Sequence, residues 1–202
     1  MFNAVHRMQG NEAHTPLTRA GFAQADAMGT ALKKWLGTRQ SLTLWSSDTG
    51  RTLQTLSIVA EHIGADWHEA RHDARLREIG IGQWVDRTYA DIQNEIGPFV
   101  DMEAGLFTVT APDGEDYRAV AERLKSWIAD QHNDHNDRLV ITHGMTARVL
   151  RGLLLDLPND ERFGAPIASK IPQGSLVMVG AGEEKIIHSP QTGTLTPDSV
   201  VA

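Results

Sequence analysis

"LTLWSSDTGRTLQT", residues 42–55, passes from a short apolar run through four polar residues into a helical repeat. The run Ser41–Ser46 predicts a strand, and the apolar spacing of Gly50–Ile63 predicts a helix that Gly64 ends. A second stretch, "LVITHGMTARVL" at 139–150, has the same form. Two such strand–turn–helix units favour an α/β fold with a mostly parallel sheet.

The rest of the chain extends this alternation of strands and helices. Apolar periodicity predicts helices at 18–36 with Thr18 as N-cap, at about 88–96, at 115–131 and at 146–155, and strands at 138–142, 175–179 and 185–188. Residues 65–86 are mixed and predict strand and loop. We therefore expect an α/β sandwich formed by a single domain over 1–202, with a loose tail from about 189.

Composition narrows the class of protein. The chain has 202 residues, of which 41% are hydrophobic and 22% charged, and it has no cysteine, which rules out disulfides and thiolate chemistry. No stretch approaches the roughly 18–20 apolar residues of a membrane span, and residues 1–10 lack the apolar core of a secretory signal, so we expect a cytoplasmic protein with no membrane partner. The net charge of −7 disfavours a nucleic-acid partner.

Polar residues follow both predicted strands at the point where a helix begins. Arg51 lies at the start of one helix, and His143 and Gly144 precede the other. Ligands of open α/β sheets gather beyond the carboxyl ends of the strands, where helix N-termini offer free N–H groups. A phosphate fits between Arg51, whose planar fork suits phosphate oxygens, and His143, which donates a charge-assisted hydrogen bond if the anion raises its pKa. Gly144 would let the backbone approach closely.

Simpler interpretations of the same residues stay open. An arginine at a helix start is often a solvated surface charge, and a histidine after a strand is often a turn residue. Glu78, in "LREIGIGQW" at 76–84, could act as a general acid if it is partly desolvated, although a loop glutamate is usually just exposed.

Two histidine patterns could suggest a metal. "HNDHND" at 132–137 has metal-like spacing but lies between a predicted helix and a strand, so we interpret it as a polar connector. His68 and His72 could share a helical face, but nothing nearby requires a ligand. We expect no metal site.

Five segments occur in a fixed order along the chain. They are "HTPLTRAGFAQA" (14–25), "SSDTGRTLQT" (46–55), "LREIGIGQW" (76–84), "APDGEDY" (111–117) and "VITHGMTAR" (140–148). In this order they resemble the signatures of the histidine phosphatase superfamily, the phosphoglycerate-mutase-like proteins, over roughly residues 3–180. The resemblance implies a three-layer α/β/α sandwich with a mostly parallel sheet.

The resemblance also bears on the N-terminus. Members of the family begin with a central strand that ends in Arg-His-Gly, where the histidine is the nucleophile. Asn3 matches the phosphate-contacting asparagine that follows this motif, so the strand and its histidine are expected to lie before Met1. A rival alignment makes His6 the nucleophile, although His6 lies only ten residues before Pro16.

A missing central strand would have a physical consequence. Two neighbouring strand edges would be unpaired beside a groove, at about 1–3 kcal/mol for each buried unpaired backbone group. We expect a substitute strand there, from residues 1–5, from residues 199–202 or from a second copy of the chain.

For a complete family protein the resemblance implies a two-step reaction. The histidine attacks phosphorus, a phosphohistidine forms, and water or another acceptor takes the phosphoryl group. Carried onto this chain, Arg51 and His143 hold the equatorial oxygens and Asn3 adds a contact, while Glu78 protonates the leaving oxygen and then activates water. No cofactor is required.

Three functions remain after this resemblance. The first is a phosphatase-type hydrolase of small phosphomonoesters, and the second is a non-catalytic relative that binds a phosphorylated ligand or a partner. The third, a phosphoglycerate mutase, ranks lower because Ile79 rather than arginine follows Glu78, and because 86–115 lacks the basic pairs that hold a diphosphorylated sugar acid. The substrate and the oligomeric state stay open, with a homodimer as one possible assembly.

Overall fold

The structure is a computed structural model that describes residues 7–38 and 42–190. Asn3 and His6 lie outside the described residues, as do the two segments named as possible substitute strands and the tail beyond Pro190.

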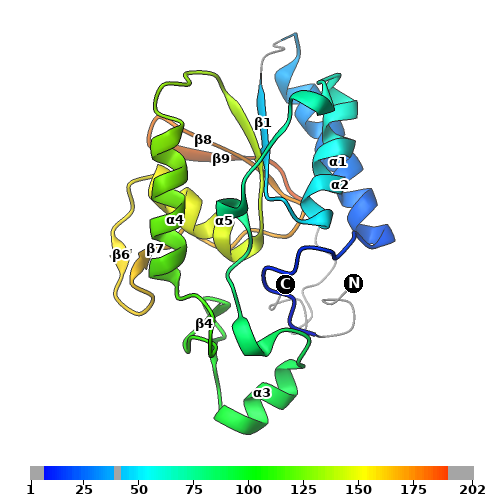
Figure 1. Cartoon of the computed structure of the whole chain (residues 1–202). Coiled ribbons are helices and arrows are strands. Elements are labelled where there is room, and N and C mark those ends of the chain that lie inside the picture. The colour runs from blue at the N-terminus through cyan, green and yellow to red at the C-terminus, as the bar shows by residue number, and fades with distance from the viewer. Residues whose placement is uncertain (1–6, 39–41, 191–202) are drawn as a thin grey trace.

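A parallel three-stranded sheet lies at the centre of the molecule, in the order β2-β1-β5 (Figure 1). The strand β1 (Thr43–Ser46) pairs along its whole length with β5 (Arg138–Ile141), and its other edge pairs with β2 (Arg71–His72). Since β1 and β5 are the strands of the two predicted strand–turn–helix units, the parallel sheet predicted from the sequence is confirmed.

Successive side chains of β1 and β5 point to opposite faces of the sheet, as strand geometry requires. Leu44, Leu139 and Ile141 belong to one buried cluster, which packs against α1 (Arg19–Leu36) and α2 (Gly50–Ile63).

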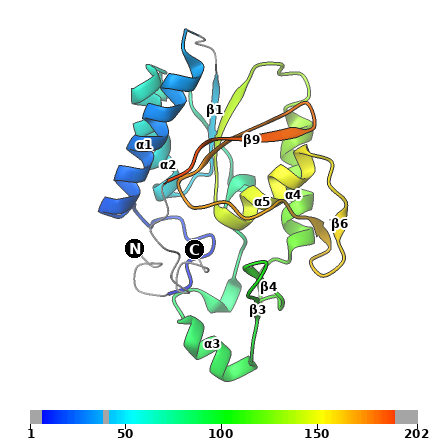
Figure 2. The ribbon, with the colours of Figure 1, turned by 180° about the vertical axis from the view of Figure 1, so that it is seen from behind.

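On the other face, Trp45 and Val140 pack into a second cluster with α4 (Tyr117–Asp130) and α5 (Gly144–Leu154). Trp45 meets Trp127 edge to face, with ring centroids 5.5 Å apart. Figures 1 and 2 show the two helix pairs on opposite sides of the sheet. The predicted three-layer sandwich is therefore confirmed.

The helix ends follow the signals in the sequence. The Thr18 side chain accepts a hydrogen bond from Gly21 N at 3.1 Å and so caps α1, and Thr88 caps the short helix α3 (Tyr89–Ile96) in the same way. Gly64 ends α2 in the left-handed conformation, with φ 68°.

The other elements are short. They are η2 (Trp67–Glu69), η3 (Ala74–Leu76), η4 (Gly82–Trp84), and the antiparallel pairs β3 (Val100–Asp101) with β4 (Leu106–Phe107), β6 (Asn159–Asp160) with β7 (Ala165–Pro166), and β8 (Leu176–Gly180) with β9 (Glu183–His188). The late strands are thus present, but they form a separate hairpin. In the described part of the chain, no helix is long and apolar enough to cross a membrane.

The strands β1 and β5 pair directly with each other in the described part of the chain. The outer edge of β5 has no partner strand among the described residues, and among these β8 pairs only with β9. Residues 140–142, at this edge of β5, line a cavity. The substitute strand expected beside an open edge stays a prediction, because residues 1–5 and 199–202 lie outside the described residues.

Candidate active site

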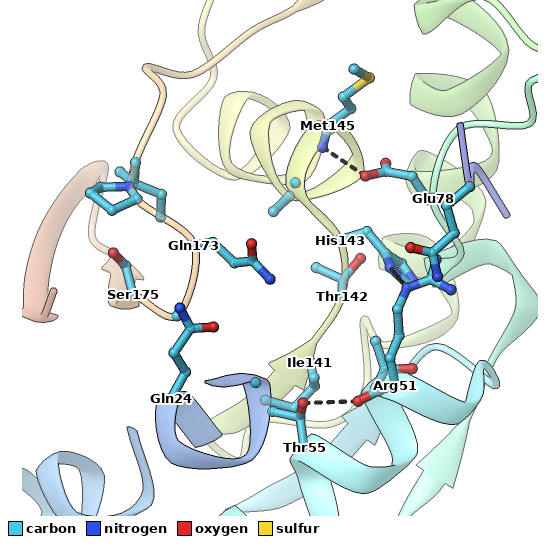
Figure 3. A pocket seen from close by; sticks show the side chains of 18 of the residues that line it. Gln24, Arg51, Thr55, Glu78, Ile141, Thr142, His143, Met145, Gln173 and Ser175 are labelled. Atoms are coloured by element: carbon cyan, nitrogen blue, oxygen red, sulfur yellow. Dashed lines mark hydrogen bonds between the residues drawn. The ribbon is translucent and has the colours of Figure 1, made fainter. Parts of the chain in front are cut away.

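A cavity of about 580 Å³ opens beyond the carboxyl end of β5. It is bordered by the starts of α1, α2 and α5 and by the segment 170–175. In Figure 3, Arg51, His143 and Glu78 lie on one side, and Gln24, Gln173 and Ser175 lie across from them. The residues that the sequence singled out from three distant segments therefore line one cavity, at the strand ends where a ligand was expected.

Arg51, at the start of α2, is held by the loop that precedes α1. Its Nη1 donates to Glu12 O at 2.8 Å and Thr15 Oγ1 at 2.7 Å, its Nη2 donates to Gly10 O at 2.9 Å, and its Nε donates to His143 Nδ1 at 3.2 Å. No carboxylate lies within salt-bridge distance of Arg51 in the described residues. Burial lowers the pKa of Arg51 below its ordinary value. The guanidinium is thus fixed at the cavity without an ion-pair partner among the described residues, although the charges of Glu78 and Glu12 act on it.

His143 lies between β5 and α5 and is 8% exposed. Its Nδ1 accepts from Arg51, because the arginine Nε–H can only donate, so the proton of the neutral ring sits on Nε2. That Nε2 lies 3.0 Å from Ser47 Oγ and 3.4 Å from Thr49 Oγ1. Burial, and then the charges of Arg51 and Arg123, hold the pKa of His143 well below its usual range. His143 is therefore neutral, and its Nδ1 is the acceptor of the ring.

Glu78 does not point freely into solvent, as a loop glutamate commonly does. Its Oε1 accepts from Ile79 N at 3.0 Å, from Thr146 N at 3.0 Å and from Thr146 Oγ1 at 3.1 Å, and its Oε2 accepts from Met145 N at 3.2 Å. The carboxylate thus caps the N-terminus of α5. Figure 3 shows the contact with Met145.

The helix N-terminus where we expected a phosphate is therefore already occupied in part by Glu78. The Gly144 N–H, one residue earlier, has no partner among the described residues and is exposed at the cavity. Gly144, Arg51 and His143 all line the cavity, and a phosphate between them stays a prediction.

Some residues at or beside the cavity were not singled out from the sequence. Ser47 and Thr49 lie in the polar turn after β1; they are fully buried, and their hydroxyls contact the His143 ring. Arg148 lines the cavity one helical turn after Gly144. Ser47 could have been recognised from the sequence, because it follows a predicted strand, and a polar side chain at such a strand end can orient the imidazole ring of a candidate histidine at the same edge of the sheet. Gln24, Gln173 and Ser175 carry no such signal.

The two histidine patterns lie in structural segments and not in a metal site of the described residues. Residues 132–137 connect α4 to β5, and His72 Nδ1 lies 3.0 Å from Ser46 Oγ. Within the part of the chain that the structure describes, no three His, Asp or Glu side chains are arranged to hold a metal.

Comparison of the sequence with known protein families identifies the family of this chain. The sequence profile of the histidine phosphatase superfamily (branch 1) matches residues 2–186. The chain belongs to this superfamily, and the resemblance noted from the five segments is confirmed.

Individual relatives place the chain among phosphatases and mutases. It is 31% identical over 160 residues to the probable phosphoglycerate mutase GpmB of Salmonella arizonae, covering 78% of this chain and 71% of that protein. A mycobacterial glucosyl-3-phosphoglycerate phosphatase in complex with VO3 is 26% identical, with a TM-score of 0.70 over 92% of this chain and 90% of that one. The α-ribazole phosphatase of Shigella flexneri, 20% identical, shares the fold with a TM-score of 0.67 over 91% and 88%.

Proposed function

We propose that this chain is a phosphatase-type hydrolase of small phosphomonoesters, with the phosphate held by Arg51, His143 and the Gly144 N–H. The observation that supports this most is that these groups and the Glu78 carboxylate line one cavity, although they come from separate elements. An arginine fork and a backbone N–H at a helix start both favour phosphate oxygens.

Binding would exchange one internal contact for contacts with the ligand. A phosphate oxygen replaces the Arg51 Nε at His143 Nδ1, and that nitrogen takes up a proton so that it can donate. Arg51 and the imidazolium then face the oxygens on which negative charge is spread in the transition state.

The reaction that we propose has two displacements. A histidine nitrogen attacks phosphorus, the ester P–O bond breaks, and the leaving oxygen takes a proton from Glu78. Water, deprotonated by Glu78, then attacks the phosphohistidine and releases phosphate and the free histidine. Glu78 Oε2 accepts a single hydrogen bond, so it has a lone pair with which to carry this proton.

The nucleophile is the part of the mechanism that the described residues do not supply. Among the described residues that line the cavity, His143 is the only histidine, and both of its ring nitrogens are engaged. We therefore propose a histidine outside them, either His6 or one encoded upstream of Met1.

A mutase is the second candidate, favoured by the relative named as a probable phosphoglycerate mutase. Against it, Arg87 is the only basic residue in 86–115, and its Nη2 pairs with Glu95 at 2.5 Å. No basic pair remains there for a second phosphate, so hydrolysis is the better supported reaction. A relative that binds phosphorylated ligands without turnover is the third candidate.

Hydrolysis of a generic aryl phosphate tests the proposal. The 202-residue chain is compared with a version extended by its own upstream codons, each also as Glu78→Gln, with exposed Glu61→Gln as the matched control. We expect Glu78→Gln to lower kcat by about 10²–10⁴, the usual contribution of a general acid. Activity of the short chain that His6→Ala abolishes assigns the nucleophile to His6, and activity of the extended chain alone assigns it upstream. Phosphate binding with no turnover by either chain would contradict a hydrolase, and isomerisation of phosphoglycerate would favour the mutase.

A further inference from the structure

The cavity gathers positive charge in an acidic protein. The chain carries a net charge of −7, yet the charged groups that line the cavity are Arg51, Arg148, Arg151 and Lys170 against the single carboxylate of Glu78. Arg151 is neutralised by Glu184, which accepts from its Nε at 2.8 Å and from its Nη2 at 2.9 Å. Beyond the proposed phosphate site, Arg148 is therefore the cavity arginine that carries no ion pair among the described residues.

Arg148 is half-buried on α5 and is fixed at the cavity wall. Its Nε donates to Ala168 O at 2.8 Å and its Nη1 donates to Ala104 O at 2.6 Å. Of its five N–H groups, the other three, including both on Nη2, have no acceptor in the described part of the chain.

Arg148 also has no carboxylate within salt-bridge distance among the described residues, unlike its neighbour Arg151. Burial lowers the pKa of Arg148 below its ordinary value. A partly buried charge is normally paired, since desolvation without a partner is costly. An arginine held in place with donors to spare, beside a cavity, is arranged to receive an anion.

The position of Arg148 relative to Glu78 indicates which part of a substrate Arg148 would meet. Glu78 accepts hydrogen bonds from Met145 N and Thr146 N in the first turn of α5, and Arg148 lies in the next turn of the same helix. Both side chains line the same cavity. A phosphomonoester with its phosphate at the proposed site and its leaving oxygen at Glu78 would therefore bring its alcohol part toward Arg148.

Building on the proposed function, we propose that the preferred substrate carries a second anionic group, such as a carboxylate, on its alcohol part and that Arg148 binds this group. The carboxylate would take up the donors of the guanidinium that Ala104 and Ala168 leave free. Lys170 lines the same cavity and adds positive charge to it, although burial, and then the charge of Arg148, lowers the pKa of Lys170.

The competing interpretation is that Arg148 only fixes the two segments whose carbonyls it binds. A purely structural role changes the stability of the fold, but it does not distinguish between two ligands that differ in one carboxylate. A ratio of affinities therefore separates the two interpretations.

The experiment uses two phosphonates that cannot be hydrolysed, 3-phosphonopropionate and propylphosphonate, with inorganic phosphate as a third ligand. Dissociation constants are measured by calorimetry for the wild type, Arg148→Met, Arg148→Lys and the exposed control Lys34→Met. We expect the wild type and Lys34→Met to prefer the carboxylate-bearing ligand by about tenfold, a difference of about 1.4 kcal/mol. The ratio should fall to about one in Arg148→Met and be partly kept in Arg148→Lys.

Equal affinities of the wild type for the two phosphonates would overturn the inference, and this comparison does not depend on a variant that folds. A tenfold ratio that persists in folded Arg148→Met would overturn the assignment to Arg148. If none of the three ligands binds the wild type, the proposed phosphate site itself is rejected. Binding of all three without a preference rejects only the second anionic group.

Discussion

Binding of an anion beside Arg51 should make His143 take up a proton. In the structure, His143 Nδ1 accepts from Arg51 Nε at 3.2 Å, and burial holds the pKa of His143 well below its usual range. An oxyanion that replaces Arg51 at Nδ1 offers only acceptors, so the ring must carry a proton there, and the negative charge of the anion favours the doubly protonated ring over a shift of the Nε2 proton to Nδ1. The pKa of His143 is therefore higher in the complex than in the free protein.

The size and sign of the pH dependence of anion binding follow from the linkage between binding and protonation of His143. Between the free and the bound pKa of His143, the dissociation constant should fall about tenfold for each unit that the pH falls, or about 1.4 kcal/mol per unit. Above the pKa of His143 in the complex, the affinity is weak and independent of pH, because the ring is neutral in both the free and the bound protein. Below the pKa of His143 in the free protein, the affinity is again independent of pH, because the ring is charged in both states.

Sulfate is the probe of choice, since it stays a dianion over the whole range and does not itself titrate. Calorimetry over a series of pH values, in buffers of different ionisation enthalpy, should show proton uptake that reaches about one proton per sulfate between the free and the bound pKa of His143. His143→Gln should abolish the uptake, whereas Glu78→Gln should keep it, which separates the two groups that could accept the proton. Binding with no proton uptake in the wild type, or the same uptake in His143→Gln, would refute this account.

Two further predictions concern stability, measured by chemical denaturation. Gly152→Ala on α5 places its Cβ 2.2 Å from Pro166 O and should cost about 2–3 kcal/mol, whereas Gly180→Ala, with no atom within 4 Å, should cost far less; equal costs would contradict the packing argument. Asp48→Asn removes the carboxylate charge and one of the two 2.6 Å hydrogen bonds from Arg77, but both side chains are about one third exposed, so the cost should be only roughly 0.5–1 kcal/mol. Hydrogen bonding from Arg77 lowers the pKa of Asp48, so this contribution should be complete above the unfolded carboxyl pKa of about 3.9 and be lost as the pH falls through the folded value; an unchanged acid profile in Asp48→Asn would contradict it.

The sequence predicted the centre of the fold because its signals there are local. The run at 138–141 is bounded by a turn, and α2 begins and ends at the glycines that its pattern marks. Residues 65–86 gave no such pattern, since Asp66 and Asp73 shape their 3-10 turns through side-chain hydrogen bonds to His68 N and Arg75 N. The pairing of β1 with β5 could not be read either, because register across such a separation depends on tertiary packing.

The candidate site was predicted in outline but not in its contacts. The convergence of Arg51 and His143 followed from the rule that parallel strands end at one edge of the sheet. Two of the acceptors of Arg51 are backbone carbonyls about forty positions away along the chain, at Gly10 and Glu12, and no periodicity marks a carbonyl. The place of Glu78 at the start of α5 was missed for the same reason.

These contacts explain why the two halves of the cavity should respond differently to a ligand. At the phosphate half, the hydrogen bond from Arg51 Nε to His143 Nδ1 breaks when an anion binds, and His143 takes up a proton. Both changes cost free energy, which offsets part of the favourable free energy of binding. At the other half, Arg148 has three N–H groups without an acceptor among the described residues and no internal bond to break. A carboxylate there should therefore add affinity that depends little on pH, so the preference for the carboxylate-bearing phosphonate should stay constant across the range in which sulfate binding changes tenfold per unit. A preference that instead follows the titration of His143 would mean that the second group binds at the phosphate half, and not at Arg148.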